Sequence, residues 1–133
     1  MILRVEHVGI AVADVAAANA LFTRLLGRAP YKEQTVEREA VITSFFQVGE
    51  TKLELVAATT PESTIAKYVA KRGEGMHHIA LEVTDIRAEM SRLEAEGFEL
   101  LSPEPKAGAD GKIICFLHPK STGGVLVELC QSV

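Results

Sequence analysis

An internal repeat constrains the fold of this chain more than any other sequence feature. Residues 7–22, HVGIAVADVAAANALF, align without a gap on residues 78–93, HIALEVTDIRAEMSRL, at a constant offset of 71 positions. The segments 51–56 (TKLELV) and 125–130 (VLVELC) also match, at an offset of 74. The second copy therefore carries about three extra residues, which we place near Ala107–Gly111. The chain is predicted to contain two copies of one structural module.

Each copy begins with a strand pattern that leads into a helix. Apolar residues at alternate positions end at Asp14 in the first copy and at Asp85 in the second, and Asp is a favoured residue for capping a helix N-terminus. Gly27 and Gly97 follow the helices as stop signals. Further strand patterns cover residues 30–37, 40–48 and 51–56 in the first copy, and 98–101, 112–117 and 125–130 in the second.

These patterns predict an α+β fold made of two paired βαβββ modules. The first module covers residues 1–57, a linker covers 58–75, and the second module covers 76–133. The linker is expected to contain a short helix, Thr64–Lys71, capped by Ser63. Because one such module cannot bury its sheet face alone, we expect both to form one domain with a curved mixed sheet around a shared cleft.

The same repeat selects four candidate metal ligands. Side chains alternate between the two faces of a strand, so the apolar positions that flank His7 and His78 leave both imidazoles on the face away from the helices. In the closing strands, Glu54 and Glu128 face away from their apolar neighbours in the same way. If a pseudo-twofold axis relates the copies, the four side chains converge. His77 falls on the helix side and is predicted to be structural, and His118 is not a predicted ligand.

Two imidazoles and two carboxylates suit a divalent ion of borderline softness, namely Co, Mn, Zn, Ni or Fe. The carboxylates offset the charge of the ion and leave coordination positions for oxygen ligands of a substrate. The sequence therefore predicts a metal-dependent site at the centre of the repeat.

Charge and composition exclude several other classes of function. The net charge of −4 and the 5% aromatic content disfavour nucleic acid as a partner. No apolar run is long enough to cross a bilayer, and no secretory signal pattern is present. Cys115 and Cys130 form no CxxC pair and lie in apolar surroundings, so both are expected to be buried thiols of a reduced compartment. We expect a protein of a reduced compartment, without nucleic-acid or membrane partners.

Several segments resemble the methylmalonyl-CoA epimerases. The matching stretches cover nearly the whole chain and include VEHVGIAV, GETKLELV, PESTIAKYVAKRGEGMHHIALEV, LLSPEPKAG and FLHPKSTGGVLVEL. The resemblance implies the glyoxalase/bleomycin-resistance-like fold and the vicinal oxygen chelate group of enzymes. It also implies a divalent cofactor, with Co2+ the first choice for activity and Zn2+, Mn2+ or Ni2+ as further options. A homodimer that acts on a CoA thioester in propionate metabolism is expected.

The resemblance assigns the metal ligands to His7, Glu54, His78 and Glu128, the set that the repeat had selected. Some epimerases have Gln at the position of Glu54. Inversion at the α-carbon needs a proton to be removed on one face of an enolate and returned on the other. We favour Glu128 as one proton carrier. Some epimerases place a second Glu on the third strand, where our alignment has Thr43, so the second carrier is Glu54, Glu39 or a metal-bound water.

Basic residues and a glycine-rich turn are candidates for holding the CoA moiety. Lys106, Lys112 and Lys120 cluster in the loops of the second module, and further basic residues lie in the linker helix. Ser121 and Gly124 belong to a turn in which the backbone can approach a substrate closely.

Three other activities are compatible with the same fold. A glyoxalase I-like lyase or isomerase acting on a thiol hemithioacetal would use the same metal ligands and similar enolate chemistry. A non-catalytic small-ligand-binding protein would not need all four ligands. An extradiol dioxygenase would need only two His and one Glu. The segments STIAKYV and HPKSTGG count against the glyoxalase-like enzyme. The presence of all four ligands counts against the binding protein, and the usually longer chain of a dioxygenase counts against the third.

Overall fold

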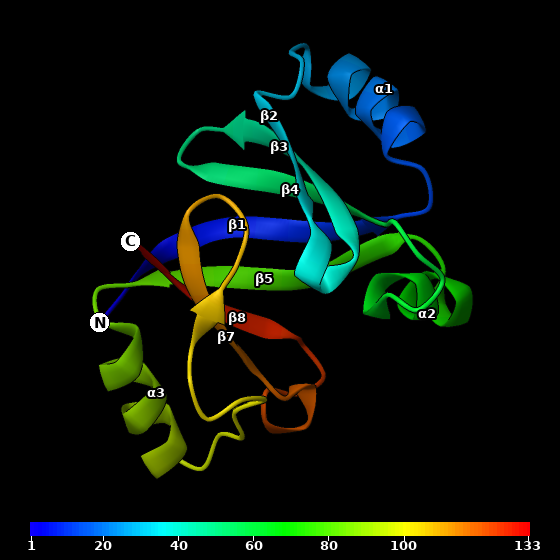
Figure 1. Cartoon of the computed structure of the whole chain (residues 1–133). Helices are drawn as coiled ribbons and strands as arrows, with labels where there is room; N and C mark the ends of the chain where they lie inside the picture. Colours follow the sequence, from blue (N-terminus) through cyan, green and yellow to red (C-terminus); the bar gives the residue numbers. More distant parts are fainter. The chain divides into compact units, whose positions relative to one another are not determined.

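The computed structural model describes residues 1–133, which form two compact units. One unit is Val8–His77, and the other combines Met1–His7 with His78–Val133. Strand β1 (Ile2–Val12) contributes residues to both units (Figure 1).

The unit Val8–His77 contains one helix on each face of its sheet. Its further elements are α1 (Val15–Leu26), β2 (Lys32–Val36), the 3-10 turn η1 (Glu37–Glu39), β3 (Val41–Val48), β4 (Thr51–Ala58) and α2 (Thr64–Arg72). The strand order is β2-β3-β4-β1. Phe46 and Leu55 are fully buried and pack in one cluster with Ala18 of α1. On the opposite side, Ile65 of α2 packs with Val41.

The unit formed by Met1–His7 and His78–Val133 has a mixed sheet with one covering helix. Its elements besides β1 are β5 (Gly75–Val83), which begins in the preceding unit, α3 (Ile86–Ala95), β6 (Lys106–Ala107), β7 (Lys112–Leu117), the 3-10 turn η2 (Pro119–Ser121) and β8 (Val127–Ser132). The strand order is β1-β5-β8-β7-β6, with β5 and β8 parallel. Leu129 and Val83 pack against Met90 and Leu93 of α3.

The predicted helix boundaries are confirmed by side-chain caps. Asp14 Oδ1 accepts hydrogen bonds from the amides of Ala16 and Ala17 at 2.9 and 3.2 Å. Asp85 Oδ1 accepts from the amide of Ala88 at 3.1 Å, and Ser63 Oγ caps α2. The helix predicted at Thr64–Lys71 is present and extends to Arg72.

The strand predicted at residues 98–101 is wrong. Only Leu100 makes an isolated bridge, to Leu117, and the edge strand β6 forms instead at Lys106–Ala107. The amide of Leu101 still donates to the carbonyl of Phe116 at 2.8 Å, but Pro103 and Pro105 have no amide hydrogen with which to continue the pairing toward Lys106. Asp110 and Gly111, both with positive φ, then turn the chain into β7 as in a type I′ hairpin.

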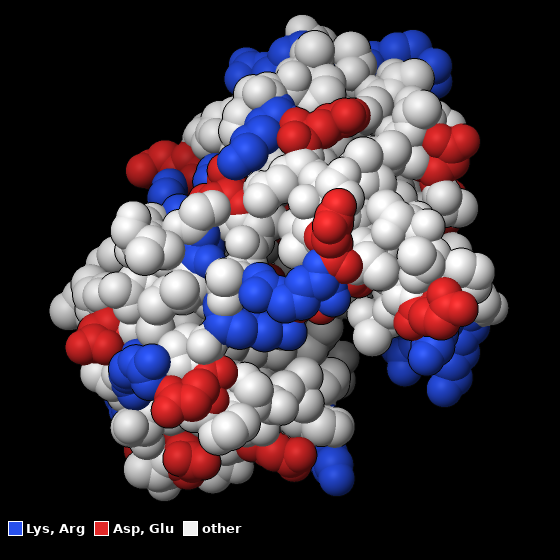
Figure 2. All heavy atoms as spheres, viewed as in Figure 1, with Lys and Arg blue, Asp and Glu red and all other residues white.

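Charged residues of both signs are interspersed on the face that Figure 2 shows. None of the helices combines the length and the apolar content needed to span a membrane. Cys115 and Cys130 are buried and not disulfide-bonded, as predicted.

Candidate metal centre

Three of the four predicted ligands come together within the unit formed by Met1–His7 and His78–Val133. His7 lies on β1, His78 on β5 and Glu128 on β8, which are consecutive in the strand order of this unit. All three side chains are buried, with exposed fractions of 6%, 7% and 5%. Neighbouring residues of the same strands, such as Val127 and Leu129, pack in the apolar core against α3. The predicted alternation of faces is therefore correct here.

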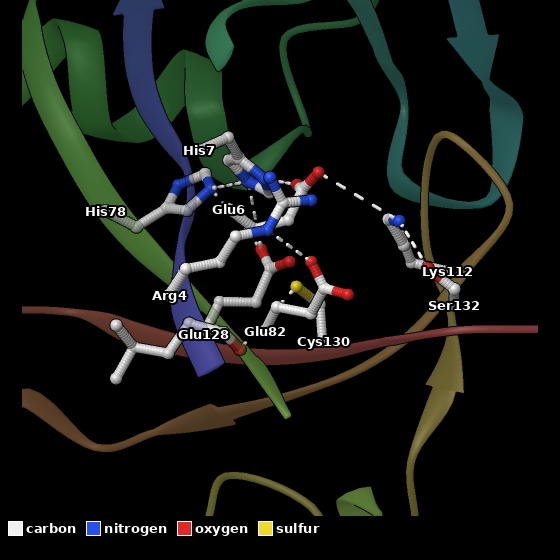
Figure 3. A network of polar contacts seen from close by, with 10 residues as sticks. Arg4, Glu6, His7, His78, Glu82, Lys112, Glu128, Cys130 and Ser132 are labelled. Atoms are coloured by element: carbon white, nitrogen blue, oxygen red, sulfur yellow. Dashed lines mark hydrogen bonds and ion pairs between the residues drawn. The ribbon is translucent and has the colours of Figure 1, made fainter. Parts of the chain in front are cut away.

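The ligand atoms of these residues converge (Figure 3). His7 Nε2 lies 3.1 Å from His78 Nε2, and Glu128 Oε1 lies 3.3 Å from His78 Nε2 and 3.8 Å from His7 Nε2. Metal–ligand bonds of about 2.1 Å place neighbouring ligand atoms about 3.0 Å apart at right angles and about 3.4 Å apart at tetrahedral angles. The two shorter separations match these values, so the donor set fits a divalent cation.

Glu6 contacts one of the two imidazoles directly. Glu6 Oε1 lies 2.7 Å from His7 Nδ1, and both side chains are buried. An ionised carboxylate can only accept, so Nδ1 carries the hydrogen and donates it. In a neutral imidazole this leaves the Nε2 lone pair directed at the other ligand atoms. A carboxylate that orients a histidine in this way is typical of metal sites in proteins.

Glu6 was not among the residues selected from the sequence. Adjacent strand residues point to opposite faces, so the alternation rule gave no reason to expect a contact between Glu6 and its neighbour. A signal was nevertheless present. Glu6 falls on the same alternate positions of the strand as the apolar residues Val8, Ile10 and Val12. A carboxylate among buried apolar residues requires a charged or hydrogen-bonding partner.

Glu54 lies on β4 of the other unit and is also buried, with 6% of its surface exposed. Leu53 and Leu55 beside it pack in the cluster against α1, so Glu54 is on the opposite face, as predicted. Its register partner on β3 is Phe45. In the second copy, Phe116 is the corresponding partner of Glu128. The repeat therefore extends to the aromatic residues across from the two carboxylates. Phe45 and Phe116 are still 71 positions apart, whereas Glu54 and Glu128 are 74 apart, so the placement of the extra residues near Ala107–Gly111 is wrong and they lie between β7 and β8.

The other two residues discussed as proton carriers also lie in the unit Val8–His77. Thr43 is buried on β3, where its hydroxyl donates a hydrogen bond to the carbonyl of Gln34 at 3.1 Å. Glu39 is the last residue of η1 and is partly exposed. The following residue, Ala40, has a left-handed conformation that turns the chain into β3.

The residues predicted to bind CoA have different surroundings. Lys106 on β6 and Lys120 in η2 have exposed side chains. Lys112 is partly buried, and its ammonium group donates to Ser132 Oγ at 2.7 Å. Ser121 Oγ accepts from the amide of Glu99 and donates to the carbonyl of His118, so this hydroxyl anchors the turn. The amide of Gly124, with a φ of 95°, donates to Pro119.

The remaining histidines and the nearby thiol have structural surroundings. The ring of His77 packs edge-on against Tyr68, with centroids 4.7 Å apart. His118 Nδ1 accepts from the amide of Lys120 and caps η2. Burial raises the pKa of the Cys130 thiol, and the carboxylates of Glu128 and Glu6 raise it further. Cys130 therefore stays protonated beside Glu128.

Sequence comparisons place the chain among known proteins over nearly its full length. Residues 6–116 match the model of the Glyoxalase/Bleomycin resistance protein/Dioxygenase superfamily. The chain is 43% identical over 133 residues to the ethylmalonyl-CoA/methylmalonyl-CoA epimerase of Cereibacter sphaeroides, an alignment that covers 98% of this chain and 99% of that protein. It is 41% identical over 130 residues to the human mitochondrial methylmalonyl-CoA epimerase, covering 97% of this chain and 74% of the human protein.

Solved structures give the same result. A variant of the Streptomyces coelicolor methylmalonyl-CoA epimerase, in complex with 2-nitronate-propionyl-CoA, matches with a TM-score of 0.95 and 32% identity, covering 100% of this chain and 96% of that one. A methylmalonyl-CoA epimerase in complex with methylmalonyl-CoA and NH4+ matches with the same score, identity and coverage. These similarities confirm the fold class predicted from the repeat.

Proposed function

The chain belongs to the methylmalonyl-CoA epimerases of the Glyoxalase/Bleomycin resistance protein/Dioxygenase superfamily, and we propose that it interconverts the (R) and (S) epimers of methylmalonyl-CoA. The observation that carries this proposal is the convergence of two imidazole nitrogens and one carboxylate oxygen in a buried cluster. Such a set, made without a nucleophilic side chain, suits proton transfer next to a carbonyl group better than acyl transfer or hydrolysis through a covalent intermediate.

We propose His7, His78, Glu128 and Glu54 as the ligands of a divalent ion. Glu54 is included because its position in the repeat, its burial and its Phe45 partner match those of Glu128. When bound, a divalent cation supplies Lewis-acid stabilisation of the negative charge on an enolate, worth several kcal/mol of the activation barrier. Cobalt is the first ion to test, followed by zinc, manganese and nickel.

Glu128 is proposed to remove the α-proton, because its carboxylate lies beside both imidazoles, 3.3 Å from His78 Nε2 and 3.8 Å from His7 Nε2, and a carboxylate can accept a proton. The return of a proton to the opposite face of the planar enolate needs a second carrier. Glu54 and Glu39 are the two carboxylates that this chain offers for that role. Thr43 is not a candidate, because its hydroxyl is neutral and already donates to Gln34.

The substrate is proposed to be held by groups at the surface of the second copy. The exposed ammonium groups of Lys106 and Lys120 can attract the phosphates of CoA, and the turn at Ser121 and Gly124 allows close approach of the backbone. We further propose that the enzyme is a homodimer and acts in the cytoplasm, in propionate metabolism.

Proton NMR in D2O tests the reaction directly. Purified protein is mixed with methylmalonyl-CoA after EDTA treatment, with and without cobalt, and the α-proton signal is followed. We expect rapid loss of that signal with cobalt, little without it, and none in Glu128→Ala. Glu94→Gln, which removes an exposed carboxylate on α3, serves as the matched control and should exchange like the parent. Ethylmalonyl-CoA run in parallel measures the acyl range.

The opposite outcome is equally informative. If cobalt binds but the α-proton persists, the epimerase proposal is wrong. A thiol hemithioacetal would then be the next substrate to test, because its isomerisation uses the same ligands and similar enolate chemistry.

A further inference from the structure

The contact between Glu6 and His7 belongs to a longer chain of polar groups within one unit. Figure 3 shows Lys112 reaching from β7 toward Glu6, and Ser132 next to it. Lys112 Nζ lies 4.0 Å from Glu6 Oε2 and 2.7 Å from Ser132 Oγ. The carboxylate of Glu6 is thus placed between an imidazole on one oxygen and an ammonium group on the other.

Burial makes this arrangement energetically consequential. Glu6 is 1% exposed and the side chain of Lys112 is 12% exposed. A buried carboxylate is costly unless it is paired with a cation and hydrogen-bonded. The geometry provides both, since Lys112 balances the charge and His7 Nδ1 donates the hydrogen bond. Ser132, the register partner of Lys112 on β8, holds the ammonium group in place.

We propose that Glu6 is a positioning residue of the metal centre, and that its carboxylate, balanced by Lys112, holds His7 as the Nδ1-protonated tautomer with Nε2 directed at the metal. This inference rests on the proposed metal site. It also means that Lys112 acts by balancing the charge of Glu6, and not by binding the phosphates of CoA. The matched position in the second copy is His77, whose ring packs against Tyr68. The two ligand histidines are therefore preceded by different groups, and the carboxylate support belongs to His7.

The first test uses the metal-free protein, so it does not depend on catalysis. Long-range proton–nitrogen correlation spectra of the 15N-labelled chain should show His7 protonated on Nδ1 only. Glu6→Leu removes the acceptor and should shift His7 toward the other tautomer. Glu6→Gln keeps an acceptor oxygen without the charge and should retain the Nδ1 tautomer. An unchanged His7 tautomer in folded Glu6→Leu would overturn the inference, and circular dichroism establishes that each variant is folded.

The second test measures cobalt affinity by competition with a chelating dye. Changes to groups that support a metal ligand typically weaken binding about 10- to 100-fold. We expect losses near the upper end for Glu6→Leu and near the lower end for Glu6→Gln. His77→Leu, next to the other ligand histidine, is the matched control and should bind cobalt within about threefold of the parent. Equal losses in Glu6→Leu and His77→Leu would contradict a specific role for Glu6.

Lys112→Met separates the two roles of the lysine. If Lys112 acts through Glu6, the variant should lose cobalt affinity and kcat while KM for methylmalonyl-CoA stays within about twofold. A raised KM with unchanged cobalt affinity would instead place Lys112 on the CoA phosphates and remove it from the inference. Failure of the proposed function would give a different result. The parent protein would then bind cobalt, and Glu6→Leu would weaken that binding, but the α-proton of methylmalonyl-CoA would not exchange. The role of Glu6 would stand and only the epimerase activity would be ruled out.

Discussion

The two copies of the repeat differ at matched positions of their last two strands. In the first copy, Val41 lies opposite Ala58, and both belong to the apolar cluster under α2. In the second copy, the corresponding pair is Lys112 and Ser132, which bond to each other. The carboxylates Glu54 and Glu128 nevertheless occupy matched, buried positions in both. The two copies therefore share the buried carboxylate and differ in other residues of the same strands.

The same contrast appears at the start of each copy. Ala18 in α1 is a small apolar residue packed in the core, whereas the matched residue in α3 is the buried carboxylate of Glu89. Glu89 accepts from the α-amino group of Met1 at 2.7 Å and from Arg92 at 2.9 Å. The second copy therefore has polar or charged side chains where the first copy packs Ala18, Val41 and Ala58, and these positions distinguish the copies experimentally.

The largest expected difference concerns the two matched carboxylates. Glu128→Gln removes the proposed base and should lower kcat about 10³-fold, in the range for the loss of a general base. Glu54→Gln keeps a ligating oxygen and should cost about tenfold or less. Deuterium exchange into methylmalonyl-CoA gives both values, with cobalt binding measured in parallel. Equal losses would remove the asymmetry and identify Glu54 as the second proton carrier.

The sequence predicted the parts of the structure that depend on local patterns. Strand alternation placed His7, His78 and Glu128 on one face, and the caps at Asp14 and Asp85 followed from residue type alone. Both features occur in each copy of the repeat. A strand or cap pattern that would be ambiguous in a single copy is a stronger prediction when the second copy has it at the matched positions.

The parts that were missed depend on tertiary pairing. The contact between Glu6 and Lys112 joins β1 to β7, although β5 and β8 lie between these strands in the sheet, and no local rule specifies such a contact. The strand predicted at residues 98–101 failed for a related reason. Its apolar residues Phe98 and Leu100 do pack on the core, but the segment joins the sheet through a single bridge, from Leu100 to Leu117, and does not continue as a strand.

A smaller effect is expected at Glu89, where it also depends on pH. The hydrogen bonds from the α-amino group of Met1 and from Arg92 lower the pKa of Glu89 below its ordinary value of 4.5. A lowered pKa in the folded state means that the ionised carboxylate stabilises the fold above pH 4.5 and that this contribution is lost as the pH falls through the lowered value. Glu89→Gln should therefore reduce the free energy of unfolding by about 1 to 2 kcal/mol at pH 7.

Urea unfolding at a series of pH values checks this expectation. The difference in unfolding free energy between the parent and Glu89→Gln should shrink as the pH falls below 4.5. Glu94→Gln, on the exposed side of the same helix, should show no such trend. A constant difference between the parent and Glu89→Gln across the series would mean that packing, rather than charge, accounts for the buried carboxylate.

The smallest expected difference lies between the two helix caps. Asp14 accepts hydrogen bonds from two amides of α1, so Asp14→Ala should destabilise the fold by about 1 kcal/mol. Asp85 accepts from one amide of α3, and Gln131 Oε1 accepts from the amide of Ile86 at 2.7 Å. Because Gln131 still satisfies the first turn, Asp85→Ala should cost only about 0.5 kcal/mol. Thermal unfolding of both variants measures the order, and the double variant Asp85→Ala with Gln131→Ala should bring the loss at α3 up to that at α1. A larger loss for Asp85→Ala alone would show that the side chain of Gln131 does not act as a second cap.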